Sequence, residues 1–205
     1  MFSKLFNFAV ERILKNSFMF ELQQKIFNDY EKVRDEFNDY LSKDGIKILD
    51  VGCSTGTAAA NIFDLAETDY SGIDISEEYI SLARNKYGSN KFLTMDATDM
   101  KFKDKTFDIV LFNGVMHHMS DELISSCLKE VRRVLKTDGY ILIGEPVFTK
   151  SMPISTFFLN HDRGKFIRST QGYENLISEF KLERKRYFRF STHRFLSLVL
   201  TKDKI

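Results

Sequence analysis

Five residues in the first half of the chain have the types and spacing of a small-ligand site. They are Asp50, Gly52, Gly56, Asp74 and Asp96. The two glycines let the backbone turn sharply and let a ligand approach without meeting a Cβ atom. Each aspartate follows a short apolar run that predicts a β-strand. At such positions Asp74 can accept two hydrogen bonds from a ribose diol and Asp96 can bind an exocyclic amine, while Asp50 lies under the glycine turn.

Two common phosphate-binding loops do not match the glycine-bearing segment, which reads Gly52-Cys-Ser-Thr-Gly56. A dinucleotide site has the spacing Gly-x-Gly-x-x-Gly, and here Ser54 stands where the second glycine lets the pyrophosphate approach. A P-loop needs Gly-Lys-Ser/Thr after the turn, and none follows. Residues 45–149 hold 11 basic and 16 acidic side chains, which suits a cationic ligand. The pattern therefore favours a ligand with a ribose and a cationic centre but no phosphate.

Short apolar strands alternate with helices between residues 46 and 144. Strands are expected at 46–51, 70–75, 91–95, 107–112 and 140–144, and helices at 57–65, from 76 onward and at 121–135. After a helix near 170–180, strands at 183–190 and 195–201 are joined by so short a link that they must be antiparallel. We expect an α/β fold, a Rossmann-like doubly wound sheet of seven strands, mostly parallel with an antiparallel C-terminal hairpin strand.

Residues 1–44 are expected to form amphipathic helices ahead of the sheet domain at 45–205. We interpret them as a lid over a pocket, with a dimer face or a membrane-surface anchor as alternatives. The 205-residue chain has a net charge of +1, and no apolar run approaches the roughly 18 residues of a membrane-spanning helix. Two cysteines make no disulfide framework, and the start lacks the features of a signal peptide. These features predict a reduced, cytoplasmic protein, either a monomer or a homodimer.

Several segments, taken in order, resemble the motifs of class I S-adenosylmethionine-dependent methyltransferases. They are Leu-Asp-Val-Gly-Cys-Ser-Thr-Gly at 49–56, Gly-Ile-Asp-Ile-Ser at 72–76, Met-Asp-Ala at 95–97, Phe-Asp-Ile-Val-Leu-Phe-Asn at 107–113 and Leu-Lys-Glu-Val-Arg-Arg-Val-Leu at 128–135. The resemblance is close over residues 45–145. The expected terminal hairpin agrees with the antiparallel last strand of that family.

The resemblance implies S-adenosyl-L-methionine as cofactor and S-adenosyl-L-homocysteine as product. The implied cofactor-binding residues are Asp50, Gly52, Cys53, Ser54, Gly56, Asp74, Ile75, Asp96, Ala97, Asn113 and Gly114. The glycine turn would lie against the amino-acid portion, Asp74 would hold the ribose, and Asp96 with Ala97 would read the adenine. Asn113 and Gly114 would flank the methionine end. Ser54 departs from the family, which often has glycine there, and a small residue should be tolerated.

The candidate proton acceptors are His117 and His118, which follow the expected fourth strand. Methyl transfer from a sulfonium is an in-line displacement, so alignment and desolvation can supply much of the catalysis. A base is needed only if the acceptor must lose a proton, and a histidine suits that role near neutral pH. The alternative is that one imidazole packs against the cofactor or caps the next helix. Two histidines without a third ligand do not predict a metal site.

Further candidates lie in an insert at 146–172 and just beyond it, between the fifth strand and the last helix. His161, Arg163 and Tyr173, together with Arg168, could orient an acidic or hydroxyl-bearing acceptor. An equally plain reading is a buried turn in which residue 162 pairs with Arg163 to fix the loop. Cys53, Cys127 and Asp108 are better explained as structural residues than as reactive ones.

The preferred methyl acceptor is a small molecule, apolar or aromatic, because the expected lid and insert are rich in phenylalanine. Asn113 is followed by Gly-Val-Met and not by the Pro-Pro-aromatic run of enzymes that methylate base amino groups, and no RNA-binding module is present. Residues 181–205 hold 8 basic and 2 acidic side chains, which keeps an RNA or protein methyltransferase as an alternative beside a solvated strand edge. A non-catalytic protein that binds the cofactor is the other alternative.

Overall fold

The computed structural model of the protein describes residues 30–147, 166–190 and 193–202. Its helices are α3 (Tyr30–Leu41), α4 (Thr57–Ile62), α5 (Glu77–Tyr87), α6 (Asp121–Val134) and α8 (Thr170–Leu176), with 3-10 turns η1 (Ser89–Lys91) and η2 (Met116–His118). Its strands are β1 (Lys47–Val51), β2 (Asp69–Asp74), β3 (Phe92–Thr94), β4 (Phe107–Asn113), β5 (Leu135–Pro146), β6 (Phe180–Phe190) and β7 (His193–Lys202). Helices and strands alternate as the sequence predicts.

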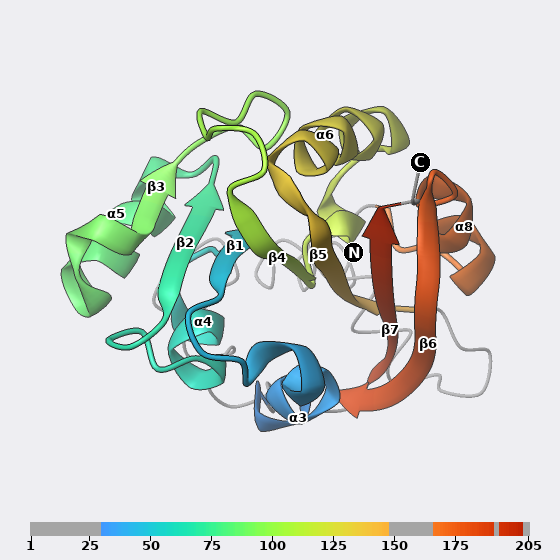
Figure 1. Ribbon diagram of the computed structural model, residues 1–205, viewed down its shortest axis with the longest axis horizontal. Helices are drawn as coiled ribbons and strands as arrows, with labels where there is room; N and C mark the ends of the chain where they lie inside the picture. The colour runs from blue at the N-terminus through green and yellow to red at the C-terminus, as the bar shows by residue number, and fades with distance from the viewer. Residues whose placement is uncertain (1–29, 148–165, 191–192, 203–205) are drawn as a thin grey trace, which may run out of the picture.

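The strands form one seven-stranded sheet in the order β3-β2-β1-β4-β5-β7-β6 (Figure 1). The pairs among β1 to β5 are parallel, and β7 runs antiparallel to both of its neighbours, β5 and β6. The expected Rossmann-like α/β fold is confirmed. The order reverses between β1 and β4, which is where open α/β sheets bind ligands beyond the carboxyl ends of their strands.

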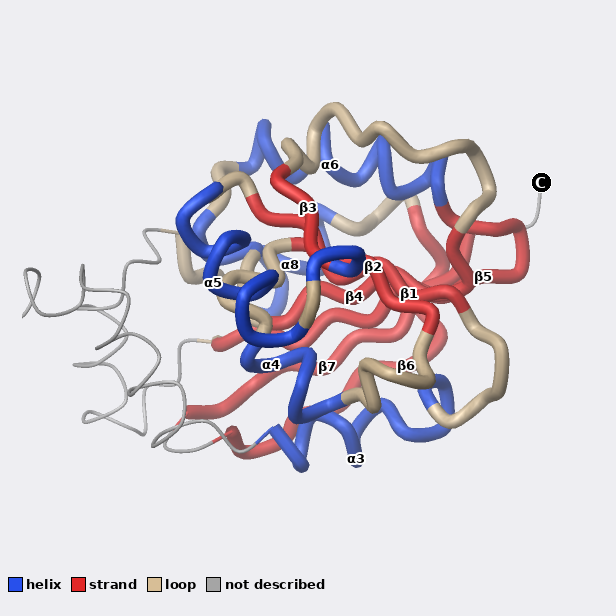
Figure 2. Tube along the Cα trace, turned by 90° about the vertical axis from the view of Figure 1, so that its left-hand side faces the viewer, coloured by secondary structure: helices blue, strands red, loops and turns tan. Residues whose placement is uncertain are grey.

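Alternating side chains send two apolar layers to opposite faces of the sheet. In β4, Ile109 and Leu111 join the core with α3, α4 and α5, whereas Val110 and Phe112 join the core with α6 and α8. Both faces are therefore covered, as a mainly parallel sheet requires. Figure 2 shows the sheet between α6 on one side and α3 with α4 on the other.

The chain enters β5 earlier than the sequence predicts. The turn expected at 137–139 lies within β5, because Leu135 is buried and already pairs with Phe107 as α6 ends. The register between the two strands then shifts, and Gly139 lies in this irregular stretch, where a Cβ atom would come 2.8 Å from the carbonyl oxygen of Asp108. Both oxygens of the Asp108 carboxylate accept hydrogen bonds from Lys136 Nζ at 2.8 Å, which supports its expected structural role.

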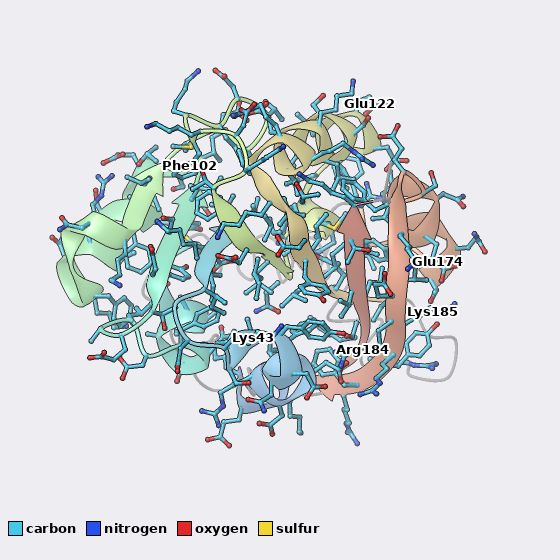
Figure 3. The ribbon with its side chains drawn as sticks, viewed as in Figure 1. Lys43, Phe102, Glu122, Glu174, Arg184 and Lys185 are labelled. Atoms are coloured by element: carbon cyan, nitrogen blue, oxygen red, sulfur yellow. The ribbon has the colours of Figure 1, made fainter. Side chains whose placement is uncertain are left out.

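Helix α3, which belongs to the segment expected to form a lid at 1–44, packs against the sheet. Its Val33 and Phe37 are completely buried against the sheet. Glu36 Oε1 accepts hydrogen bonds from Arg184 Nη2 of β6 at 2.9 Å and from Ser197 Oγ of β7 at 2.8 Å. Figure 3 labels Arg184 on the part of β6 that lies beside α3. The boundary expected at residue 44 therefore does not separate two cores. Residues 1–29 of the expected lid, and residues 148–165 of the insert, lie outside the described residues.

The hairpin elements also differ in their bounds. Helix α8 ends at Leu176 and β6 begins at Phe180, where a strand was expected only from residue 183. Phe180 is buried and pairs with Lys202 of β7, so the hydrophobic side chain draws the chain into the sheet sooner. Among the described helices, none is long and apolar enough to cross a lipid bilayer.

Candidate active site

The turn after β1 is held open by three residues in the left-handed backbone region. Gly52 (φ 75°), Ser54 (φ 52°) and Gly56 (φ 74°) alternate with residues of ordinary conformation. The N–H groups of Gly52 and Cys53 both donate to the carbonyl oxygen of Ile73, at 2.8 and 3.0 Å. The turn is thus tied to β2, and Ser54 carries the backbone strain that a glycine would avoid.

Asp74 ends β2 and faces this turn. Its Oδ2 accepts from the N–H of Ser54 at 3.0 Å, and its Oδ1 accepts from the N–H of Ser76 at 2.9 Å. Each oxygen of a carboxylate has a second acceptor site, so a diol could bind the remaining ones. The next side chain, Ile75, is 76% exposed and offers an apolar surface beside the carboxylate.

Asp96 follows β3, which is the neighbour of β2 in the sheet. Its Oδ1 accepts from the N–H and from the hydroxyl of Thr98, both at 2.8 Å, and these bonds lower the pKa of the Asp96 carboxyl. Ala97 is partly buried against the core on the α6 face. Asp74 and Asp96 therefore end two adjacent strands at the same edge of the sheet.

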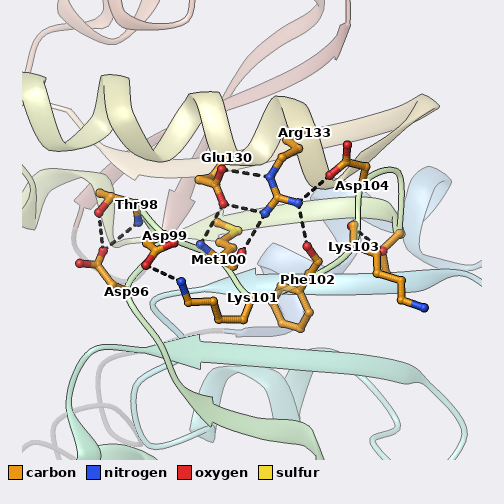
Figure 4. Close-up of polar contacts among 11 residues, drawn as sticks. Asp96, Thr98, Asp99, Met100, Lys101, Phe102, Lys103, Asp104, Glu130 and Arg133 are labelled. Carbon is orange, nitrogen blue, oxygen red and sulfur yellow. Dashed lines mark hydrogen bonds and ion pairs between the residues drawn. The ribbon is translucent and has the colours of Figure 1, made fainter.

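Arg133 of α6 fixes the loop that carries Asp96. Its guanidinium donates to the carbonyl oxygens of Met100 and Phe102, to Asp104 and twice to Glu130, at 2.7 to 3.0 Å (Figure 4). Glu130 also accepts from the N–H of Met100 at 2.9 Å. All five N–H donors of the arginine are used, so the loop is anchored to α6 along its length.

Asp50 lies beneath the glycine turn and is only 4% exposed. Tyr70 donates its hydroxyl to Asp50 Oδ2 at 2.8 Å. Burial raises the pKa of the Asp50 carboxyl to about 7, the Tyr70 bond opposes this, and the negative charge of Asp74 adds to it. Burial also raises the pKa of Cys53 well above its ordinary value, and that of Cys127 to about 12, so neither thiol has the character of a nucleophile.

The turn after β4 lies against the turn after β1. It contains Gly114 (φ 68°), Val115 and η2. A Cβ atom on Gly52 would be 2.2 Å from Cγ2 of Val115, so only glycine allows the two turns to meet this closely. The carboxylate of Glu145, at the end of β5, accepts the N–H groups of Val115 at 2.8 Å and Met116 at 2.7 Å.

The two candidate histidines have different surroundings. His117 is 4% exposed, and its Nδ1 lies 2.8 Å from Oε2 of Glu145. His118 is exposed, and its ring is 4.1 Å from the ring of His117, centre to centre. The structure thus brings His117 to the turn that carries Asn113 and Gly114.

Tyr173 and Arg168, which were expected to orient the acceptor, are hydrogen-bonded to other parts of the chain. Tyr173 is completely buried and donates its hydroxyl to the carbonyl oxygen of Pro146 at 3.2 Å. Arg168 uses all five of its N–H donors on Asp121 and on the carbonyl oxygens of Met116, Met119 and Phe166. These bonds support a role in holding the turn rather than in binding an acceptor carboxylate. His161 and Arg163 lie outside the described residues.

A family model described as a methyltransferase domain matches residues 49–143. This span contains the turn after β1, Asp74, Asp96 and the turn after β4. Residues 49–143, a little under half of the chain, therefore resemble a methyltransferase domain.

Several known proteins are similar to this chain in sequence or in fold. The demethylmenaquinone methyltransferase of Chlorobaculum tepidum is 31% identical over 137 residues, which is 63% of this chain and 56% of that protein. A demethylmenaquinone methyltransferase of Staphylococcus aureus is 28% identical over 183 residues, 75% of each protein. The chain thus spans little more than half the length of the first of these relatives. A crystal structure of an S-adenosylmethionine-dependent methyltransferase from Archaeoglobus fulgidus, 17% identical, has the same fold with a TM-score of 0.71 over 89% of this chain and 99% of that one.

The polar groups of this site fit S-adenosylmethionine, the cofactor that the resemblance implies. Among the described residues, buried side-chain atoms without a hydrogen-bond partner are Ser54 Oγ, Asn113 Oδ1 and Arg184 Nε. Two of these three belong to the turns after β1 and β4, where the resemblance puts the amino-acid portion of S-adenosylmethionine. Because unpartnered buried polar atoms are costly, their concentration at this edge indicates a polar ligand there.

Three residues of the site are absent from the sequence predictions: Val115, Glu145 and Arg133. The sequence does mark Glu145 as unusual, because it is a single charged residue directly after the apolar run Ile-Leu-Ile-Gly at 141–144. An acidic side chain there must find hydrogen-bond donors, and the structure shows them on a different strand. Val115 and Arg133 are ordinary residues in the sequence, and only the fold shows what they contact.

Proposed function

We propose that this protein transfers the methyl group of S-adenosyl-L-methionine to a small-molecule acceptor and releases S-adenosyl-L-homocysteine. The observation that supports it best is the placement of Asp74 and Asp96 at the ends of the adjacent strands β2 and β3, next to the turn at Gly52 and Gly56 that follows β1. Two carboxylates in this arrangement match a ribose diol and an adenine amine, with no cation or phosphate loop between them.

In this proposal each end of the cofactor has its own set of residues. The backbone of the Gly52–Gly56 turn and the Asn113 amide hold the amino-acid portion, Asp74 and Ile75 hold the ribose, and Asp96 with Ala97 contacts the adenine. The bound sulfonium supplies an electrophilic methyl group, so the chain's task is to orient the acceptor and keep water out. The buried Asp50 carboxyl group accepts the Tyr70 hydroxyl beneath the turn and so supports it from below.

The proposed acceptor is apolar or aromatic and carries a hydroxyl group. The two relatives named above are both demethylmenaquinone methyltransferases. In this chain the buried His117 offers a proton acceptor at the turn after β4, and Val115 and Met116 supply apolar contacts beside it. Such surroundings suit a flat apolar acceptor better than a charged macromolecule.

Two measurements test this function in sequence. Isothermal titration with S-adenosyl-L-homocysteine should show binding of one molecule per chain. The protein should then transfer a labelled methyl group from S-adenosyl-L-methionine to a member of a panel of phenols, naphthoquinols and other aromatic hydroxyl compounds. Binding without transfer to any compound would favour a non-catalytic cofactor-binding protein. Salt-sensitive transfer to RNA or protein instead would contradict the small-molecule acceptor.

A further inference from the structure

Glu145 is a completely buried carboxylate at the end of β5. It accepts four hydrogen bonds from the turn after β4, and every donor comes from three consecutive residues. Oε1 accepts the N–H groups of Val115 (2.8 Å) and Met116 (2.7 Å), and Oε2 accepts the N–H (3.3 Å) and the ring Nδ1 (2.8 Å) of His117. A carboxylate has about four acceptor sites, so this set uses all of them and leaves no place for a proton on Glu145.

These bonds determine which nitrogen of His117 carries the proton. An ionised carboxylate only accepts, so Nδ1 must be the protonated nitrogen of the neutral ring, and Nε2 must be the one with a lone pair. Cε1, the ring atom between the two nitrogens, lies 3.8 Å from where a Cβ on Gly114 would be. The Cε1 edge of the ring therefore lies beside Gly114. The proposed function places Gly114 at the methionine end of the cofactor.

The same bonds hold the turn against the cofactor loop. Two of the four donors are the N–H groups of Val115 and Met116, and the Val115 side chain covers Gly52. Movement of Glu145 would therefore shift both the proton acceptor and the loop that binds the cofactor. Arg168 holds the other side of this turn through the carbonyl oxygens of Met116 and Met119.

We propose that Glu145 is a positioning residue, which fixes His117 as the Nδ1-protonated tautomer and so makes Nε2 of His117 the proton acceptor for a hydroxyl-bearing acceptor. This rests on the proposed function for the identity of the reaction. Nε2 takes the hydroxyl proton, and the oxygen electron pair forms the new bond to the methyl carbon as its bond to sulfur breaks, with those electrons kept by sulfur. The imidazolium that results faces the Glu145 carboxylate, which stabilises its charge.

The tautomer can be read in the free protein without any acceptor. In the full chain labelled with 15N-histidine, NMR at pH 8 should show Nδ1 of His117 as the protonated, pyrrole-type nitrogen and Nε2 as the pyridine-type nitrogen. A His117→Gln variant assigns the signals by their loss, and His118→Gln assigns those of the neighbouring ring. A wild-type protein with the proton on Nε2 would overturn the proposal.

Glu145→Gln is the decisive variant. The amide keeps the size of the side chain but presents an N–H donor in place of one acceptor, so Nδ1 of His117 should lose its proton and the two signals should exchange their types. Glu122→Gln, the same substitution at an exposed residue of α6, should leave the His117 signals unchanged. Unchanged His117 signals in folded Glu145→Gln would also overturn the proposal. If that variant does not fold, Glu145→Asp replaces it, and its shorter carboxylate should give a mixture of the two tautomers.

The kinetic consequence separates this proposal from the proposed function. With a hydroxyl acceptor, Glu145→Gln and His117→Gln should each lower kcat by about 100-fold or more, and the double variant should be little worse than either single one. Equal activity of His117→Gln and wild type would overturn the role of His117 while methyl transfer stands. Absence of transfer to any acceptor would overturn the proposed function, whereas the NMR result would still decide the role of Glu145 in holding His117.

Discussion

The side chain of Val115 occupies the space where a Cβ on Gly52 would have to lie, with its Cγ2 2.2 Å from that position. Gly52 follows β1 and Val115 follows β4, so this contact joins the two turns at the point where the order of the sheet reverses. It explains why a glycine is needed there in terms of packing as well as of ligand access.

Gly52→Ala should therefore destabilise the protein more than Gly45→Ala does. Both glycines have positive φ (75° and 70°), but no atom lies within 4 Å of a Cβ placed on Gly45. Placing an alanine at positive φ should cost about 1 kcal/mol of stability at either position. The clash of its Cβ with Val115 should cost about 1–3 kcal/mol more at Gly52. Urea unfolding measures both losses, and equal values would show that Val115 moves aside without cost.

Asp74→Asn should weaken binding of S-adenosyl-L-homocysteine by about 10- to 100-fold, because the ribose would lose a charged acceptor worth about 1.5–3 kcal/mol. Asp69→Asn is the matched control at the other end of β2. Asp69 is exposed there and pairs with Lys47 at 3.2 Å, so its loss should not change the affinity. Isothermal titration compares the two variants. Equal affinities for Asp74→Asn and wild type would remove Asp74 from the cofactor site.

Arg133→Lys should loosen the loop between Asp96 and Asp104 even though it keeps the charge. A lysine has one nitrogen and cannot reach the carbonyl oxygens and carboxylates that the planar guanidinium binds together. We expect a loss of about 1–3 kcal/mol in stability, faster amide exchange in the loop and weaker cofactor binding.

Arg132→Lys is the control on the same helix, since Arg132 donates to the carbonyl oxygen of Glu179 and lies over the ring of Phe180, away from that loop. Hydrogen exchange followed by mass spectrometry locates the change. If the loop amides lose the same protection from exchange in both variants, Arg133 does not specifically stabilise the residues between Asp96 and Asp104.

The pH dependence of stability should carry a contribution from Asp50. Its pKa is about 7 in the folded protein and near 3.8 without burial, so between these values the folded state holds a proton that the unfolded state has lost. Stability from this group is therefore fully present below pH 4, falls as the pH rises from 4 to 7, and is lowest above 7. Three pH units correspond to at most about 4 kcal/mol.

Asp50→Asn removes this titration and keeps an oxygen for the Tyr70 hydroxyl. The variant should gain stability relative to wild type as the pH rises from 4.5 to 8.5, with the difference levelling off above pH 7. Urea unfolding at several pH values gives the comparison. Parallel curves for the two proteins would show that Asp50 ionises at its ordinary pH in the folded state.

Most of the fold was predictable because it depends on local patterns. Local sequence is enough to predict the strands from their apolar runs and the start of α5 from the serine before its acidic first turn. It is also enough to predict the antiparallel hairpin from the short link between β6 and β7. The carboxylates at the ends of β2 and β3 were predictable for a related reason, since Asp74 is the last residue of β2 and Asp96 lies two residues after the end of β3.

The remaining features depend on residues that are far apart in the chain. Arg168 and Tyr173 have the side chains of a binding site, but their partners 27 to 52 residues earlier use up their hydrogen bonds. Glu145 finds its donors about 30 residues earlier, on the turn after β4. Patterns of spacing do not report such distances, so the contacts of these three residues can be seen only in the folded chain.

Glu36 is hydrogen-bonded to Arg184, which comes 148 positions later in the chain, and to Ser197, which comes 161 positions later. During synthesis on the ribosome, α3 emerges early, whereas its partners in the hairpin emerge near the end. Until then the edge of β5 that later pairs with β7 has no partner strand. We expect nascent chains that stop before β7 to aggregate and to bind chaperones, and the last step of folding to be the closure of the hairpin over α3.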